Sequence, residues 1–183
     1  MTLPNKITFF RLIMAPIGAG FLVYGSADLG PQIAFAIFLI AMLSDVLDGY
    51  LARKNKQVTD LGTYLDSLSD KIIIFLYFIF LTSFQFYPAW LFILFFFREM
   101  FMDGFKNFAL GKGAVITSKR SGKNKALLQT LSILAALLSL SISHEFSLIL
   151  SDFAYYSMII SFLISIYGAY VLIKPNLKVF KDQ

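Results

Sequence analysis

Long apolar runs alternate with short polar segments along the whole chain. Six runs approach the roughly 20 residues that a helix needs to cross a membrane, and they cover approximately residues 7–25, 31–53, 61–83, 88–109, 124–143 and 149–173. Open sheets do not survive in hydrocarbon, and the runs lack the two-residue alternation of barrel strands. We therefore expect an all-α fold, a polytopic membrane protein in which residues 1–183 form one domain. Its architecture should be a bundle of six transmembrane helices joined by short connections.

The composition supports this expectation and narrows the chemistry. Hydrophobic residues make up 58% of the 183 residues, and the mean hydropathy is +0.74, which is high for a soluble domain of this size. The chain contains no cysteine, so disulfides, thiolate metal sites and cysteine nucleophiles are excluded.

Positive charge is distributed unevenly among the connections. Lys and Arg cluster at the start of the chain, around the second and fourth connections and in the tail, whereas the first, third and fifth connections contain none. By the positive-inside rule both termini should face the cytoplasm. The net charge of +5 then lies on one side, where it suits an anionic lipid surface or a phosphate substrate. We expect membrane lipids, and no nucleic acid, as partners.

Four aspartates lie within the second and third apolar runs, where each charge costs about 2.5–3.5 kcal/mol on insertion scales. Asp45 and Asp48 are three residues apart, and Asp66 and Asp70 are four apart, so each pair lies on one helix face. The two pairs mirror one another about residue 57. An antiparallel hairpin turning there would bring all four carboxylates together, in the inner half of the membrane and within reach of the cytoplasm.

Such a cluster predicts a metal site. Four negative charges so close repel strongly unless they are protonated or neutralised. Oxygen ligands without His or Cys favour Mg²⁺ or Mn²⁺, and four carboxylates suit two such ions. A purely structural role is disfavoured, because buried carboxylates without a ligand would destabilise the bundle.

A divalent-cation transporter is the alternative from another functional class, because intramembrane aspartates can also form an ion path. Two features argue against it. The carboxylates stop in the inner half of the membrane, and the apolar runs lack the paired broken helices that mark many transporter sites.

The complete pattern is Asp-x2-Asp-Gly-x2-Ala-Arg-x8-Gly-x3-Asp-x3-Asp, from Asp45 to Asp70. It resembles the signature of the CDP-alcohol phosphatidyltransferase family. The resemblance implies a six-helix enzyme that transfers a phosphatidyl group from CDP-diacylglycerol to an alcohol and releases CMP. It also implies that Asp45, Asp48, Asp66 and Asp70 bind the metal ions and that Asp70 acts as general base. The implied CDP-binding residues are Gly49, Ala52, Arg53 and Gly62.

Other segments resemble the bacterial phosphatidylglycerophosphate synthase branch of that family: the opening Leu3-Pro4-Asn5, the pair Arg98-Glu99 and the element Gly122-Lys123-x-Lys125. This resemblance implies glycerol 3-phosphate as acceptor and phosphatidylglycerol phosphate as product. It also implies a homodimer in the bacterial cytoplasmic (inner) membrane, with the active site facing the cytoplasm.

An acceptor that carries a phosphate needs a basic pocket near the metal ions. The candidate residues are Thr8, Arg11, Arg98, Lys119, Arg120, Lys123 and Lys125. Arg98 has an alternative role as the partner of Glu99 or Asp103 in an ion pair. The acceptor itself stays open, because Ala126 stands where this branch usually has Thr. Serine, inositol phosphate and phosphatidylglycerol are the alternative acceptors.

Overall fold

The computed structural model describes residues 3–54, 60–114, 120–142 and 145–177. Within these ranges, the side chains of residues 3–6, 46–48, 50–54, 60–61, 63 and 120–123 lie outside the description.

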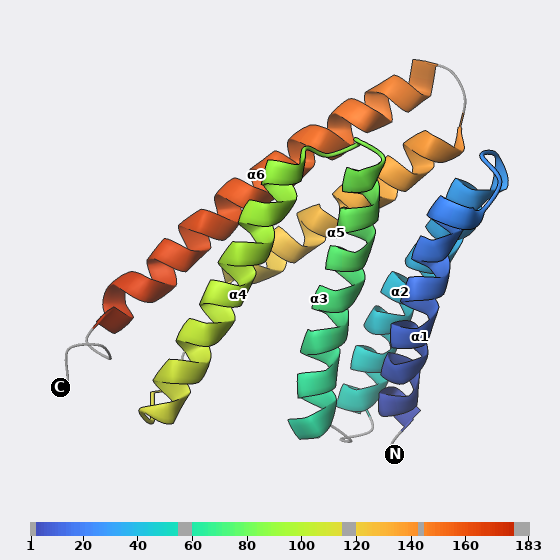
Figure 1. Cartoon of the computed structure of the whole chain (residues 1–183). Coiled ribbons are helices and arrows are strands. Elements are labelled where there is room, and N and C mark those ends of the chain that lie inside the picture. The colour runs from blue at the N-terminus through green and yellow to red at the C-terminus, as the bar shows by residue number, and fades with distance from the viewer. Residues whose placement is uncertain (1–2, 55–59, 115–119, 143–144, 178–183) are drawn as a thin grey trace.

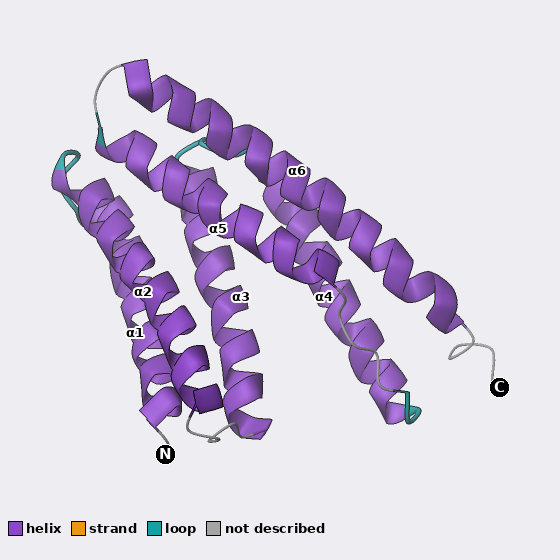
Figure 2. Ribbon diagram, turned by 180° about the vertical axis from the view of Figure 1, so that it is seen from behind, coloured by secondary structure: helices purple, strands orange, loops and turns teal. Residues whose placement is uncertain are grey.

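Six helices make up almost all of the described chain, as Figures 1 and 2 show from opposite sides. Their bounds are α1 Leu3–Tyr24, α2 Leu29–Lys54, α3 Asp60–Ser83, α4 Ala89–Gly111, α5 Arg120–Ser141 and α6 Glu145–Asn176. No strand occurs among the described residues. The prediction of an all-α protein with six helices is therefore confirmed.

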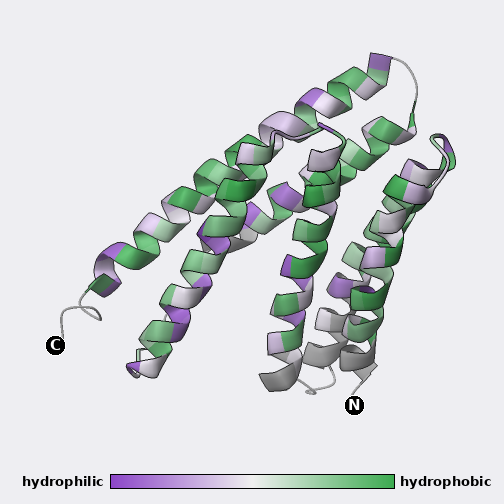
Figure 3. Cartoon of the chain, in the orientation of Figure 1, coloured by the Kyte–Doolittle hydropathy of each residue, from purple (hydrophilic) through white to green (hydrophobic). Residues whose placement is uncertain are grey.

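Three of the helices are long and apolar enough to cross a membrane, through the stretches Ile7–Tyr24, Asn124–Ser141 and Glu145–Asn176. α2 adds a shorter apolar stretch over Leu29–Asp45. α3 and α4 fall short of the same criterion because charged residues interrupt them, and Figure 3 shows these hydrophilic positions among the green apolar ones. Large apolar side chains such as Phe97 and Phe146 are 70% and 73% exposed, which suits contact with lipid. The chain is a multi-pass membrane protein.

The helices pack in two groups. α1 packs against both α2 and α3, while α5 and α6 form the most extensive pair and cross the others obliquely (Figures 1 and 2). α2 contacts α5 and so joins the groups, whereas α4 packs less extensively, against α3 and α6. The start of α1 and the end of α6 lie toward the same end of the bundle (Figure 1).

Aromatic rings fill the middle of the core. Phe78 is fully buried, and its ring meets those of Tyr87, Phe92 and Phe95 edge to face. The Tyr87 hydroxyl lies 2.7 Å from Ser132 Oγ on α5, so this buried polar group has a partner. The packed aromatic core fixes α3 against α4 and α5.

Gly18 allows α1 to lie close to its two neighbours. A Cβ atom added at this position would clash with the Tyr77 hydroxyl of α3 and would lie 2.7 Å from Ile37 Cγ2 of α2. Two helical turns before Gly18, α1 carries Arg11. The close approach at Gly18 therefore helps to bring Arg11 against α2 and α3.

We expect Gly18→Leu to destabilise the protein by about 1–3 kcal/mol, because a side chain forced into a packed interface displaces its neighbours. The measurement is the thermal unfolding midpoint in detergent. Gly20→Leu is the matched control, since a Cβ at Gly20 would meet nothing within 4 Å. An equal loss of stability in the two variants would contradict the close approach at Gly18.

Candidate active site

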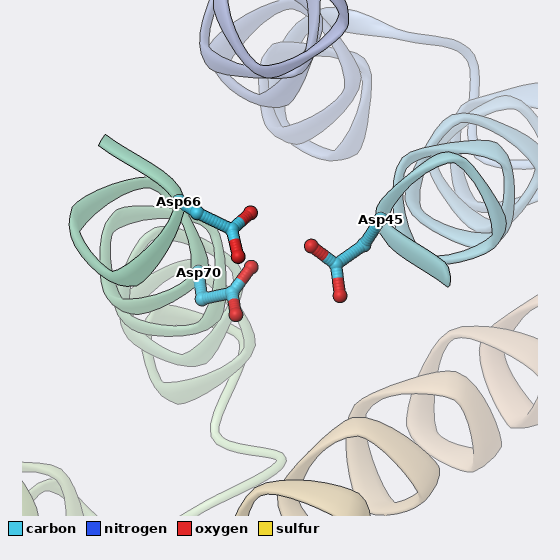
Figure 4. Close-up of side chains that lie close together, drawn as sticks. All are labelled: Asp45, Asp66 and Asp70. Atoms are coloured by element: carbon cyan, nitrogen blue, oxygen red, sulfur yellow. The ribbon is translucent and has the colours of Figure 1, made fainter. Parts of the chain in front are cut away.

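Three carboxylates from two helices converge on one point. Asp45 comes from α2, and Asp66 and Asp70 come from successive turns of α3. One oxygen from each lies within 4.8 Å of the others, and Figure 4 shows the three side chains pointing toward one another. Their side chains are 31%, 44% and 47% exposed, so the cluster is partly accessible to solutes.

The fourth predicted ligand, Asp48, follows Asp45 by one helical turn in α2, but its side chain lies outside the described residues. The same holds for the side chains of Ala52 and Arg53, predicted to bind CDP. Gly49 and Gly62 are half-buried and stand one turn from Asp45 and Asp66 respectively. The two glycines therefore flank the carboxylate cluster along the chain.

Arg11 of α1 is the counter-ion of these carboxylates. Its side chain is 1% exposed, and Nη1 lies 2.5 Å from Asp45 Oδ1 and 3.2 Å from Asp70 Oδ1. Its second terminal nitrogen, Nη2, donates to Asp66 Oδ1 at 2.7 Å. One guanidinium against three ionised carboxylates leaves two negative charges. The spacing and the all-oxygen donor set thus fit a divalent cation such as Mg²⁺ or Mn²⁺.

The sequence placed Arg11 and Thr8 among the candidates for the acceptor phosphate. The structure brings Arg11 onto the carboxylates, and Thr8 is buried one turn earlier on the same helix. Sequence analysis did not predict the contacts of Arg11, because spacing along one helix does not show which neighbouring helix a side chain faces.

A cavity of about 290 Å³ adjoins the cluster, between α3, α4, α5 and α6. Asp70 lines this cavity and also belongs to the carboxylate cluster. Basic side chains line the cavity as well: Lys71, Arg98, Lys106 and Lys125. The cavity therefore brings the carboxylate of Asp70 close to a wall with several basic side chains.

Arg98 and Lys125 are held by a single carboxylate. Glu99, which is 6% exposed, accepts hydrogen bonds on Oε1 from Arg98 Nη1 and from Lys125 Nζ, the latter at 2.6 Å. The other end of the guanidinium donates to the backbone carbonyl of Ser165 at 2.6 Å. Glu99 is thus the observed partner of Arg98. Asp103, the other partner considered, instead accepts hydrogen bonds from Lys71 on both of its oxygens. Two cations against one anion leave an excess positive charge facing the cavity.

The remaining basic candidates lie near the start of α5. Arg120 and Lys123 belong to this helix, but their side chains, like all of Lys119, lie outside the described residues. Sequence analysis missed the contribution of α6, which lines the cavity through Ser165 and Gly168. The available signal was the four-residue spacing of Ser157, Ser161 and Ser165 within an apolar run.

The fold and the site together define a multi-pass helical membrane protein with an acidic cluster beside a basic cavity. The model of the CDP-alcohol phosphatidyltransferase family matches residues 1–167, and the chain belongs to this family of transferases.

Several bacterial relatives carry specific names. A CDP-diacylglycerol--glycerol-3-phosphate 3-phosphatidyltransferase of Bacillus subtilis is 35% identical over 147 residues, which cover 74% of this chain and 76% of the relative. The protein of the same name from Mycoplasma pneumoniae is 31% identical over 77% of this chain and 70% of its own length. A probable phosphatidylglycerophosphate synthase of Mycobacterium tuberculosis is 32% identical over 76% of this chain and 67% of its own length.

We expect Arg11→Met to lower the stability of the metal-free protein by about 1–3 kcal/mol. This is less than the roughly 3–5 kcal/mol for breaking a fully buried ion pair, because solvent screens the partly exposed carboxylates. Added Mn²⁺ should reverse most of the loss by neutralising the same carboxylates. Thermal unfolding in EDTA and in Mn²⁺ measures both effects.

Lys112→Met is the control for Arg11→Met, because Lys112 is an exposed cation at the end of α4. It should unfold like the wild type in both conditions. If Arg11→Met lowers the stability by the same amount in EDTA and in Mn²⁺, the arginine is not the counter-ion of a metal site.

Proposed function

We propose that this protein transfers the phosphatidyl group of CDP-diacylglycerol to glycerol 3-phosphate, releasing CMP and forming phosphatidylglycerol phosphate. The observation that carries the proposal is the position of Asp70, which belongs to the carboxylate cluster and lines the basic cavity. A single side chain thus adjoins both the site that suits divalent cations and the basic cavity that suits a phosphorylated alcohol. The names of the relatives support glycerol 3-phosphate as the acceptor.

In this proposal Asp45, Asp48, Asp66 and Asp70 hold Mg²⁺ or Mn²⁺, as two ions. Divalent ions bound there would neutralise charge on the diphosphate of the lipid and on the departing CMP. Gly49, Ala52, Arg53 and Gly62 bind the CDP group beside the carboxylates, where two glycines leave space.

Asp70 is the proposed general base. The acceptor hydroxyl lies in the cavity and gives its proton to Asp70 as its oxygen bonds to the phosphorus that carries the diacylglycerol. The bond from this phosphorus to the oxygen of the leaving CMP breaks. The half-buried position of Asp70 at the cavity wall supports this role, because the carboxylate is reachable from the cavity without being fully solvated.

Arg98 and Lys125 are the proposed ligands of the acceptor phosphate. Both line the cavity and carry its excess positive charge. Lys119, Arg120 and Lys123 come from the segment before Lys125 and are proposed to extend this basic wall. We assign Arg11 to the carboxylate cluster rather than to the acceptor, because it contacts Asp45, Asp66 and Asp70. Thr8 remains a proposed ligand of the acceptor phosphate.

The same proposal places the protein in the bacterial cytoplasmic (inner) membrane, with both termini and the active site facing the cytoplasm. The one-sided Lys and Arg distribution supports this orientation. We propose a homodimer as the working form, as the family resemblance implies.

The second candidate function is transfer of the phosphatidyl group to a different acceptor, and one observation supports it. Ala126 lines the cavity, so the position at which the chain departs from the synthase branch faces the proposed acceptor. A methyl group there removes a hydroxyl that could bind the acceptor. Serine, inositol phosphate and phosphatidylglycerol are the compounds to compare.

The acceptor is tested by supplying purified protein with CDP-diacylglycerol, Mg²⁺ or Mn²⁺, and each of the four acceptors. We expect CMP release to be fastest with glycerol 3-phosphate and to yield phosphatidylglycerol phosphate. Turnover with another acceptor but not with glycerol 3-phosphate would overturn the assignment. Uptake of divalent ions into proteoliposomes without CMP release would favour a transporter instead.

The roles of the aspartates are tested by Asp66→Asn and Asp70→Asn, which keep the shape of the side chain and remove its charge. We expect each to lower CMP release at least about 100-fold, in the range for losing a positioned base or a charged ligand. Asp152→Asn is the control, because Asp152 is an exposed carboxylate on α6, and it should keep wild-type activity. Near-normal release by either site variant would refute the proposed site.

A further inference from the structure

Three serines lie four residues apart on one buried face of α6. Ser157, Ser161 and Ser165 are 4%, 0% and 1% exposed. Ser157 donates to the Ala154 carbonyl at 3.1 Å, and Ser161 donates to the Lys125 carbonyl at 3.0 Å. Ser165 Oγ is buried and has no hydrogen-bond partner among the described residues. The three side chains share the same chemistry and are all buried, but among the described contacts only Ser165 Oγ of the three has no hydrogen-bond partner.

An unsatisfied buried hydroxyl destabilises a fold, so its presence needs an explanation. Ser165 differs from the other two serines in its surroundings, because it lines the cavity next to Arg98. The guanidinium is fixed there by its bond to the Ser165 carbonyl, and its Nε is also buried with no partner in the described part of the chain. Two unused buried donors therefore belong to two residues that line this cavity and contact each other through the Ser165 carbonyl.

The side chains in this part of the cavity wall favour binding of an anion with several oxygens. Ser165 Oγ and Arg98 Nε can donate, and Lys125 adds a second positive charge. The acidic group nearby, Glu99, already accepts from both cations. Charge-assisted hydrogen bonds from a guanidinium and an ammonium are typical of phosphate recognition. Since rotation about a single bond redirects a serine hydroxyl, Ser165 can reach a bound anion without backbone movement.

We propose that Ser165 is a specificity residue that donates a hydrogen bond to the phosphate of the acceptor, beside Arg98 Nε. This inference rests on the proposed function and adds to it a ligand from α6. When the phosphate of the acceptor is bound there, its hydroxyl group remains available to Asp70, which lines the same cavity.

The test compares Ser165→Ala with Ser157→Ala, a matched control two turns away on the same face. Ser165→Ala should raise KM for glycerol 3-phosphate about tenfold, as expected for one hydrogen bond to a charged group, with kcat within threefold of the wild type. Its unfolding midpoint should be unchanged or higher, because the unsatisfied hydroxyl is gone. Ser157→Ala should leave KM within twofold and should not raise the midpoint.

A structural role for Ser165 predicts the opposite pattern. Ser165→Ala would then lower the unfolding midpoint, and KM would stay near the wild-type value. Either result would overturn the proposal.

A second acceptor separates the phosphate from the alcohol groups. The compound 3-hydroxypropyl phosphate retains the phosphate and the terminal hydroxyl and lacks the middle hydroxyl of glycerol 3-phosphate. If Ser165 binds the phosphate, Ser165→Ala raises KM for both acceptors by the same factor. An increase confined to glycerol 3-phosphate would assign Ser165 to the middle hydroxyl and overturn the proposal.

A binding measurement distinguishes failure of this inference from failure of the proposed function. Inorganic phosphate, added in EDTA without CDP-diacylglycerol, should raise the unfolding midpoint of the wild type and of Ser157→Ala more than that of Ser165→Ala. If this difference appears but glycerol 3-phosphate is not turned over, the anion site stands and the acceptor is wrong. If glycerol 3-phosphate is turned over and Ser165→Ala changes neither KM nor phosphate binding, the function stands and the role of Ser165 is wrong.

Discussion

Arg11 carries one positive charge into the space between Asp45, Asp66 and Asp70, in a bundle otherwise held mainly by apolar packing. Without it, three carboxylates from α2 and α3 would repel one another across that interface. The charge comes from α1, so α1 must lie against both other helices. This requirement is consistent with the packing of α1 on α2 and α3 and with Gly18, where a Cβ atom would clash with side chains of both helices.

Sequence reasoning reached the fold and the acidic centre because both depend on spacing. Apolar runs of membrane-spanning length define six helices, and the mirrored pairs of aspartates place carboxylates from α2 and α3 opposite each other. The structure brings Asp45, Asp66 and Asp70 together as this spacing predicts. Periodicity along each helix is sufficient for such features, since it fixes which residues share a face.

The rest of the site depends on how the helices are rotated against each other, and spacing does not contain this information. Arg11 could have faced the acceptor cavity or the carboxylates from the same position in α1. Ser165 is one of several serines in α6, and the sequence does not show that Ser157 and Ser161 find partners while Ser165 does not. Long-range packing decides both cases.

The cations that face the cavity also fasten α4 to the bundle. This helix packs less extensively than its neighbours, and it is tied to α3 by Lys71–Asp103 and to α5 by Glu99–Lys125, while Arg98 holds it to α6. An anion that binds Arg98 Nε and Lys125 attaches to the same two side chains that tie α4 to α6 and α5. Binding of an anion in the cavity and packing of α4 against the bundle are therefore linked equilibria. Because such linkage is reciprocal, a bilayer that shifts α4 also changes the affinity of the cavity for the anion.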